Sequence, residues 1–234
     1  MERARGERSR TALMTAPSEV TVADTIRWLH DEGLVRLIGV GERSSAPVAA
    51  YTVAVATGEV SAYPSGGIGA AVQSFPADDL PYPNGTSRRL VVVGVTAQET
   101  VLVVDLSVAY TLAINASRPE PVARAWLMQL LLNPDNTVST NSGGLAVSAG
   151  ERCRQTFIPG GSATLFTVDD RRPPATTVTL NPVAESPDRL EVESDGSGEL
   201  YIGSRFWQLR LVLTVDDGGW ALLTEQLESA AESA

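Results

Sequence analysis

The sequence contains no lysine, a single histidine (His30) and a single cysteine (Cys153). The absence of lysine excludes Schiff-base catalysis, a lysine general base and the lysine of a nucleotide phosphate loop. With one histidine, a two-histidine metal site is impossible, and a Ser–His–Asp triad would have to use His30. One cysteine can form neither an intramolecular disulfide nor a cysteine metal cluster. We therefore predict no catalytic, cofactor-binding or metal-ligating residue.

Long apolar runs are also missing. The longest candidate, residues 101–114, is interrupted by Asp105 and Ser107 and is shorter than the roughly 18 residues that a membrane helix requires. The first 17 residues lack the apolar stretch of a secretory signal, and we predict a flexible tail over 1–17. These patterns favour a cytoplasmic protein without membrane insertion.

The charge balance is acidic. Eighteen arginines stand against 28 aspartates and glutamates, and the formal net charge is −10. Such a charge repels nucleic acid unless basic side chains cluster. The arginines instead occur singly or in pairs, such as Arg88-Arg89 and Arg171-Arg172. Nucleic acid is therefore not an expected partner.

Length and composition are those of an ordinary globular protein. A chain of 234 residues with 43% hydrophobic residues fits one large domain or two small ones. We predict an α/β domain over 18–172, followed by a β-hairpin-rich part over 173–234 that packs on the same core. The expected fold class is α/β, with a mixed sheet, a buried crossover helix and a β-rich C-terminal part closed by a helix.

The N-terminal half alternates helical and β-like patterns. Apolar residues at helical spacing predict a helix over 18–32 that ends at Gly33. Strands are expected over 34–40 and, with a turn near its end, over 49–60. Prolines and glycines over 63–84 indicate a long surface connection.

The central sequence predicts buried strands. Continuous apolar runs over 90–95 and 100–106 are typical of strands that are buried on both faces. Further strands are expected over 110–115, 144–147 and 163–168. Together with the helix between them, these strands suggest a β-α-β unit with a right-handed crossover.

That helix is expected over 121–132. Ser117 and Glu120 have the spacing of a capping box, and prolines are tolerated in the first turn of a helix. Only Arg124 and Gln129 are polar within the helix, so we expect it to be almost wholly buried.

The C-terminal part has a strong hairpin pattern. β-like runs over 189–193 and 199–203 flank a Ser-Asp-Gly-Ser-Gly turn, and a further strand follows over 206–215. A last helix is expected from about 220 to 228, capped by Asp216 or Asp217. Its expected inward face consists of Trp220, Leu223 and Leu227.

Two segments deserve comparison with nucleotide sites. Residues 114–121 lie between a strand and a helix, as a phosphate loop does, but they contain no glycine or lysine. Two prolines there remove amide donors, and Glu120 adds repulsion, so a structural turn is favoured. Asp169 and Asp170 end an apolar strand and resemble a magnesium-holding acidic pair. A solvated strand end is the favoured interpretation.

The remaining candidates are explained better by structure than by chemistry. Glycine loops at 65–67 and 159–162 have no neighbouring nucleophile pattern, and turns explain them. His30 lies near a helix end, where the helix dipole favours it. Cys153 is expected to be a small, semi-buried residue. Core anchoring is the expected role of the tryptophans Trp28, Trp126, Trp207 and Trp220.

The order of these elements is similar to that of a known family. The segment from Pro81-Tyr82-Pro83 through LVVVGV, TVLVVDL and YTLAINASRPEPVARAWLMQLLL, with the later RLEVESDGSGELYIGSRFWQLRLVLT, carries the likeness over about 47–228. It resembles the central region of actinobacterial membrane proteins that have a LysM module and a bacterial transcriptional activation domain. The strand-to-helix turn resembles that of FtsK/SpoIIIE-type motor ATPases, which implies a phosphate loop that lost its chemistry. The sequence departs from the family because it shows no membrane helix, LysM module or helical activation domain.

These observations favour a non-catalytic protein-interaction or regulatory module, with a degenerate nucleotide-binding fold as one basis for it. The expected partner is another protein, bound through an apolar patch near 63–84 or the last helix. No cofactor is expected. Two alternatives stay open: a subunit of a larger homo- or hetero-oligomeric assembly, and a nucleotide-binding protein or hydrolase that uses Asp169, Asp170 and a glycine loop.

Overall fold

The computed structural model describes residues 20–65, 71–85, 89–109, 111–147, 152–156, 163–169 and 176–232. The predicted tail over 1–17, the glycines at 66–67, the loop at 159–162, Asp170 and the Arg171-Arg172 pair lie outside these residues.

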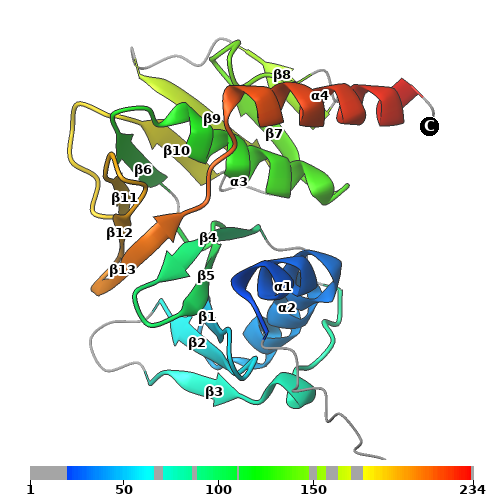
Figure 1. Cartoon of the computed structure of the whole chain (residues 1–234), viewed down its shortest axis with the longest axis vertical. Coiled ribbons are helices and arrows are strands. Elements are labelled where there is room, and N and C mark those ends of the chain that lie inside the picture. The colour runs from blue at the N-terminus through cyan, green and yellow to red at the C-terminus, as the bar shows by residue number, and fades with distance from the viewer. Residues whose placement is uncertain are drawn as a thin grey trace, which may run out of the picture.

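Within the described residues, thirteen strands form one mixed sheet, and helices lie on both of its faces (Figure 1). The strand order is β3-β2-β1-β5-β4-β13-β12-β11-β6-β10-β9-β7-β8. The strands are β1 Val48–Ala54, β2 Val60–Pro64, β3 Gln73–Phe75, β4 Leu90–Thr96, β5 Thr100–Asp105, β6 Thr111–Ala116, β7 Thr137–Thr140, β8 Cys153–Gln155, β9 Thr164–Asp169, β10 Thr176–Leu180, β11 Arg189–Val192, β12 Gly198–Ile202 and β13 Arg205–Val212. The helices are α1 Val22–Trp28, α2 Leu34–Arg43, α3 Glu120–Leu132 and α4 Asp217–Glu232.

The N-terminal helix is longer than the sequence predicts. Thr21 and Asp24 cap α1 reciprocally, and a π-helical turn over Leu29–Gly33 leads directly into α2. The predicted helix end at Gly33 and the predicted strand over 34–40 are therefore wrong. Leu37 and Val40 repeat at helical spacing, and both are fully buried against the sheet. A short apolar run fits either period, and here the tertiary packing selects the helix.

Gly33 has a packing role at the π-helical turn. The indole ring of Trp28 covers it so closely that a Cβ at this position would lie 2.7 Å from the ring. A glycine here thus accommodates the tryptophan and does not stop the helix.

The strands of the N-terminal half form an antiparallel group. The expected turn within 49–60 joins β1 to β2, with Gly58 at a φ of +70°. β4 and β5 are the predicted central strands, and their side chains are buried almost throughout, as expected. The connection over 63–84 is more structured than predicted, because it contains β3 and a 3-10 turn over Ala77–Asp79.

The crossover around α3 agrees with the prediction in outline. β7 runs parallel to β6, since β9 is antiparallel to both β7 and β10, and β10 is parallel to β6. Nine residues of α3 are buried, as expected for a helix with two polar positions. The predicted capping box is wrong, because Pro119 is the N-cap and no side chain caps the helix. The strand predicted over 144–147 is also wrong, since this segment forms a turn followed by irregular chain.

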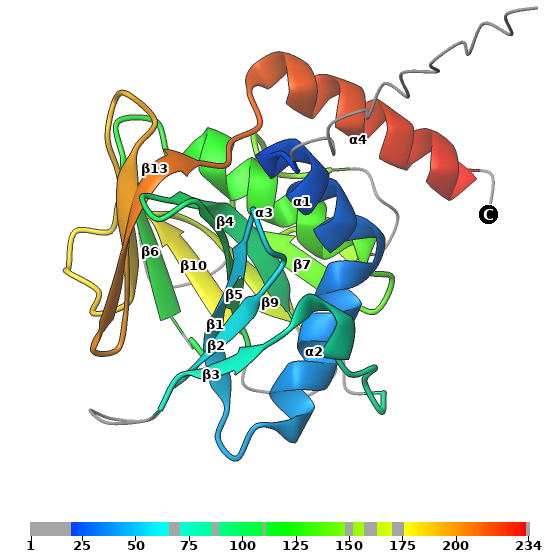
Figure 2. The same cartoon turned by 60° about the horizontal axis from the view of Figure 1, so that its bottom comes forward.

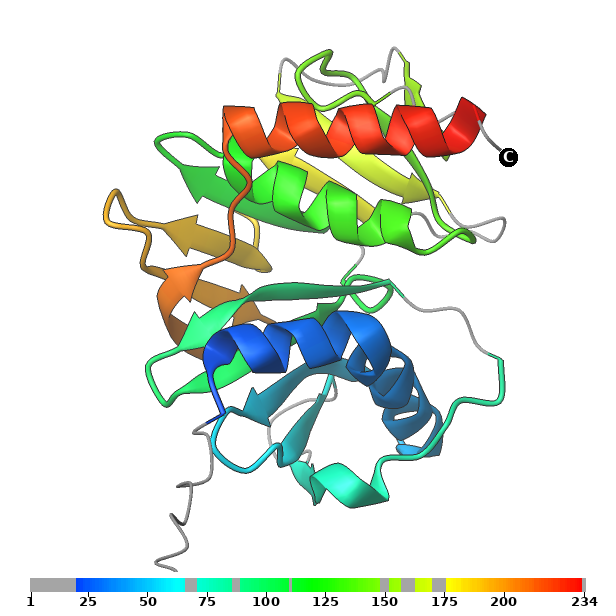
Figure 3. The same cartoon turned by 45° about the vertical axis from the view of Figure 1, so that its right-hand side comes forward.

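The C-terminal strands fill the middle of the sheet. β11 and β12 form the predicted hairpin, and β13 follows as expected. β11 pairs in parallel with β6, whereas β13 pairs with β4, so these three strands join the two halves of the chain (Figure 2). Helix α4 then runs alongside α3, with Trp220 buried and Leu223 and Leu227 on the core (Figure 3).

Two groups of buried side chains make up the core. One face of β1, β4 and β5 packs against α1 and α2 through a group that includes Leu37 and Val103. The opposite face joins a larger group around α3, which includes Trp126 and extends over the central and C-terminal strands. β4 and β5 are thus covered on both faces, which explains their continuous apolar sequences.

Candidate functional site

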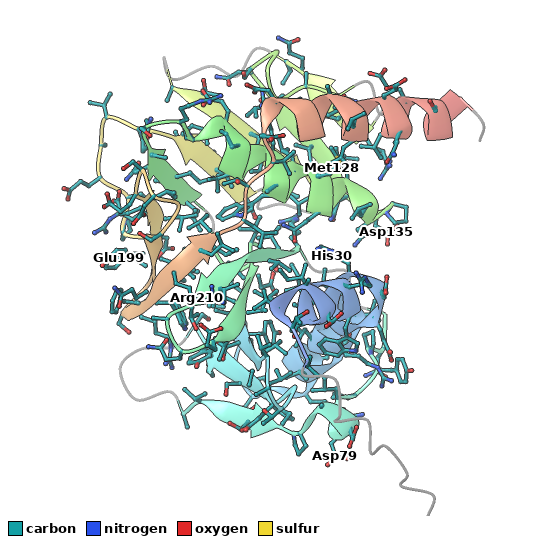
Figure 4. The ribbon with its side chains drawn as sticks, in the orientation of Figure 1. His30, Asp79, Met128, Asp135, Glu199 and Arg210 are labelled. Carbon is teal, nitrogen blue, oxygen red and sulfur yellow. The ribbon has the colours of Figure 1, made fainter. Side chains whose placement is uncertain are left out.

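A groove lies between α2 and the C-terminal end of α3. Figure 4 labels His30, which lines the groove, and Asp135, which adjoins it in the chain. The groove has a volume of about 320 Å³. We call it the α2–α3 groove, and its lining residues are His30, Leu34, Val35, Ile38, Leu90, Gln129, Leu132, Asn133, Pro134 and Asn136.

The walls of the groove are apolar and open to solvent. Val35 of α2 is 47% exposed, and Leu132, the last residue of α3, is 62% exposed. Leu34 and Ile38 also line the groove; both are half-buried and packed against the core. Because α2 turns Leu37 and Val40 toward the sheet, Val35 faces away from it.

The floor of the groove contains an unusual pairing between a helix and a strand. The backbone N–H of Val92 donates to Oε1 of Gln129 over 2.7 Å, and Nε2 of Gln129 donates to the carbonyl of Val92 over 3.0 Å. The same nitrogen also donates to the carbonyl of Ala125 over 3.1 Å. The register between β4 and β5 shifts between Val92 and Gly94. β13 pairs with β4 from Gly94 onward, and Leu213, directly after β13, donates to the carbonyl of Val93 over 2.8 Å. The side chain of Gln129 therefore supplies hydrogen-bond partners for the N–H and carbonyl of Val92, which β13 does not reach.

The polar end of the groove is formed by His30, Asn133 and Asn136. Asn136 is 4% exposed, and its Nδ2 donates to the carbonyl of Leu130 over 3.1 Å. The side chain of His30 keeps contact with solvent, but partial desolvation by its neighbours lowers its pKa below the ordinary value, while the charge of Asp31 opposes this shift. His30 is thus a neutral imidazole at pH 7, able to donate one hydrogen bond and accept another. Among the described residues, no group of three or more His, Cys, Asp or Glu side chains is arranged to hold a metal ion.

Two arginines near the groove already form hydrogen bonds with other groups of the chain. Arg36 donates to Glu32, to the carbonyl of Leu80 and to the hydroxyl of Tyr82, and it stacks on the Tyr82 ring. Arg152 donates to the carbonyls of Leu131 and Asn133 at the end of α3.

Two acidic residues beside the groove are not bound in this way. Asp31 and Asp135 are exposed and adjoin lining residues in the chain. Within the part of the chain that the structure describes, neither carboxylate forms an ion pair. Among the described residues, Arg36 and Arg152 are therefore bound by the chain itself, whereas Asp31 and Asp135 form no ion pair.

The predicted phosphate-loop-like turn is a structural junction. The side-chain amide of Asn181 accepts from the N–H of Ala116 over 3.0 Å and donates to the carbonyl of Ala116 over 2.9 Å. These two bonds are of the same kind as those between Gln129 and Val92. Arg118 and Arg124 both bind the carboxylate of Asp217, and these arginines lower its pKa, with Arg124 the larger cause. The chain thus binds its own carboxylate with the two arginines of this junction.

The other sequence candidates do not meet at the groove. Asp169 ends β9, and Asp170 lies outside the described residues. Cys153 is buried on β8, and burial raises the pKa of its thiol, which disfavours the reactive thiolate. Trp126, Trp207 and Trp220 are buried as expected, and Trp28 is half-buried over Gly33.

Sequence reasoning missed most of the groove. From the sequence, His30 is a lone histidine near a predicted helix end, and Gln129 is one of two polar residues of a predicted apolar helix. The strand predicted over 34–40 includes Val35, and the helix predicted over 121–132 to be almost wholly buried includes Leu132. The available signal was the helical spacing over 34–40, which would have placed Val35 on the outer side of a helix.

A second pocket, of about 380 Å³, lies between α1 and the β1–β2 hairpin. It adjoins Val20, the first residue that the structure describes. Its polar lining is already engaged, since Asp24 caps α1 and Thr25 donates to the carbonyl of Thr21. We therefore consider the α2–α3 groove the stronger candidate.

Comparisons with known proteins add no assignment. No family model, curated protein or solved structure matches the chain. The resemblance to the LysM and transcriptional-activation family thus stays a prediction. No helix among the described residues is long and apolar enough to cross a membrane.

Proposed function

We propose that this chain is a non-catalytic protein-interaction module that binds another protein through the α2–α3 groove. The observation that carries the proposal is the exposure of two large apolar side chains, Val35 and Leu132, on the walls of one groove. Apolar side chains gathered in a depression of the surface are typical of sites where a partner buries its own apolar side chains.

The size of the groove favours a protein partner over a small molecule. Its volume of about 320 Å³ lies at the lower limit of small-molecule pockets, roughly 300–1,000 Å³. Its polar floor is already satisfied, because Gln129 is bonded to Val92 and Ala125. A groove of this kind can receive one or two side chains of a partner. The amide of Gln129 is not free to bind and orient a polar ligand.

Site-specific photo-cross-linking in the protein's own host tests the proposal. A photoreactive phenylalanine analogue replaces Val35 in one variant and Leu132 in another. The matched control carries the analogue at Val183, which is fully exposed and far from the groove in the sequence. We expect positions 35 and 132 to cross-link to the same protein, and position 183 not to do so.

A second variant tests whether cross-linking from position 35 requires the groove. Leu132→Arg places a charge on the groove wall at an exposed position, so the fold should be retained, which thermal unfolding checks. We expect this change to abolish cross-linking from position 35. Different proteins captured from positions 35 and 132, or capture that is unaffected by Leu132→Arg, would contradict the proposal.

A further inference from the structure

We propose that the segment bound by the α2–α3 groove carries one or two large apolar side chains next to a lysine or arginine. This inference rests on the proposed function and specifies the chemistry of the partner. It follows from the apolar walls of the groove together with the charges at its polar end.

The apolar part of the inference follows from the walls. Val35 and Leu132 face solvent, and Leu34 and Ile38 line the same groove as half-buried side chains. Water in contact with these side chains is released when an aliphatic or aromatic side chain replaces it. The groove volume of about 320 Å³ limits the insertion to one or two side chains of a peptide segment.

The basic part follows from which charges are free. Asp31 follows His30 directly, and Asp135 lies between the lining residues Pro134 and Asn136. Figure 4 shows His30 and Asp135 on the two halves of the molecule that the groove separates. Neither carboxylate has an ion-pair partner among the described residues, whereas Arg36 and Arg152 are engaged by the chain itself.

The uncharged state of His30 supports the same conclusion. Partial desolvation lowers the pKa of its imidazole, so the neutral form predominates at pH 7 and this side chain adds little positive charge to the polar end. Asp31 and Asp135 therefore set the local potential there, and a lysine or arginine beside the apolar side chain of the partner complements it.

A phage-displayed library of random 16-residue peptides is the direct probe. The full chain is the bait, and Leu132→Arg serves for counter-selection, so that retained peptides require the groove. We expect the retained peptides to combine Leu, Ile, Phe or Trp with a nearby Lys or Arg. Synthetic copies should lose at least about tenfold in affinity for the Leu132→Arg variant, since a buried apolar contact is replaced by a charge.

The charge contribution is measured with two matched double variants. Asp31→Asn with Asp135→Asn should weaken peptide binding about two- to thirtyfold, the combined effect of removing two exposed carboxylates that attract the Lys or Arg of the peptide. Asp78→Asn with Asp79→Asn changes the net charge equally at the 3-10 turn, where Figure 4 shows Asp79 far from the groove. This control should leave the affinity unchanged.

The outcomes distinguish failure of this inference from failure of the proposed function. Groove-dependent peptides without Lys or Arg, or an equal loss in both double variants, would overturn the inference and leave the proposed function standing. A selection that yields no peptide dependent on Leu132 would overturn the proposed function together with the inference.

Discussion

Gln129 pairs with Val92 through both hydrogen-bonding groups of the strand residue, at 2.7 Å to its N–H and 3.0 Å to its carbonyl. A residue of a neighbouring antiparallel strand makes the same two bonds. The side-chain amide thus continues the pairing of β4 beyond the end of β13 and attaches α3 to the sheet. It also closes the floor of the α2–α3 groove with polar groups that are already satisfied.

Replacing Gln129 by methionine should therefore destabilise the fold by about 2–4 kcal/mol, because Val92 keeps a buried N–H and a buried carbonyl without partners. Urea unfolding measures the free energy. Gln226→Met, on the exposed side of α4, is the control and should change it by less than about 0.5 kcal/mol. Equal effects at the two positions would show that the pairing contributes nothing.

Trp126→Ala should cost about 3–5 kcal/mol, as truncations of fully buried aromatic side chains do. Trp126→Phe should cost less than half of that. The indole N–H has no hydrogen-bond partner among the described residues, so this substitution loses volume but no such bond. Chemical denaturation compares both variants with Leu222→Ala at an exposed position of α4. A cost below 1 kcal/mol for Trp126→Ala would contradict the buried position of α3.

Gly94→Ala should destabilise the chain by about 2 kcal/mol or more, since overpacking against backbone has no simple relief. A Cβ at this position would lie 2.1 Å from the carbonyl oxygen of Leu211, in the pairing of β4 with β13. Gly144→Ala is the matched control, because the nearest atom to its Cβ is 3.7 Å away. Thermal unfolding of both variants tests the difference. A neutral Gly94→Ala would mean that β4 and β13 are not in close contact.

Stability should fall as the pH drops below about 6.5, the ordinary pKa of histidine, because His30 has a lowered pKa in the folded chain. In this window the unfolded chain binds a proton that the folded chain does not, which favours unfolding. Above pH 6.5 the effect is absent. Asp24, Asp195 and Asp217, whose pKa values are lowered, contribute stability that is lost only as the pH falls below their ordinary 3.8.

Urea unfolding at pH 7.5, 6.0 and 5.0 measures this dependence. His30→Asn should flatten it between pH 6.5 and 5.0, because asparagine does not titrate there. If the variant and the parent chain lost stability in parallel, His30 would not be its source.

ATP with magnesium should give no binding heat in calorimetry. The strand-to-helix turn contains Pro119, Glu120 and Pro121, and its arginines are bound to Asp217. Micromolar affinity that is lost in Arg118→Ala would contradict this prediction and restore the nucleotide-binding alternative.

The sequence predicted correctly those elements whose residue pattern fits only one type of secondary structure. The runs at 90–95 and 100–106 are too apolar for a solvated face, and the Ser-Asp-Gly-Ser-Gly segment fits a hairpin turn. The strand predicted over 34–40 is wrong, because a short apolar run fits both the period of a strand and the period of a helix. β7, β8 and β10 are short and polar on one face, so they carry little local signal.

By itself, the sequence determined the hairpins, the two central strands and the apolar helix after Pro119, because turn chemistry and side-chain periodicity act between residues close along the chain. The tertiary structure decided the order of the strands, the insertion of β11–β13 between β4 and β6, and the partner of Gln129. It also decided that Val35 and Leu132 share one groove. These features depend on pairings between residues far apart in sequence, whose free energies no local pattern encodes.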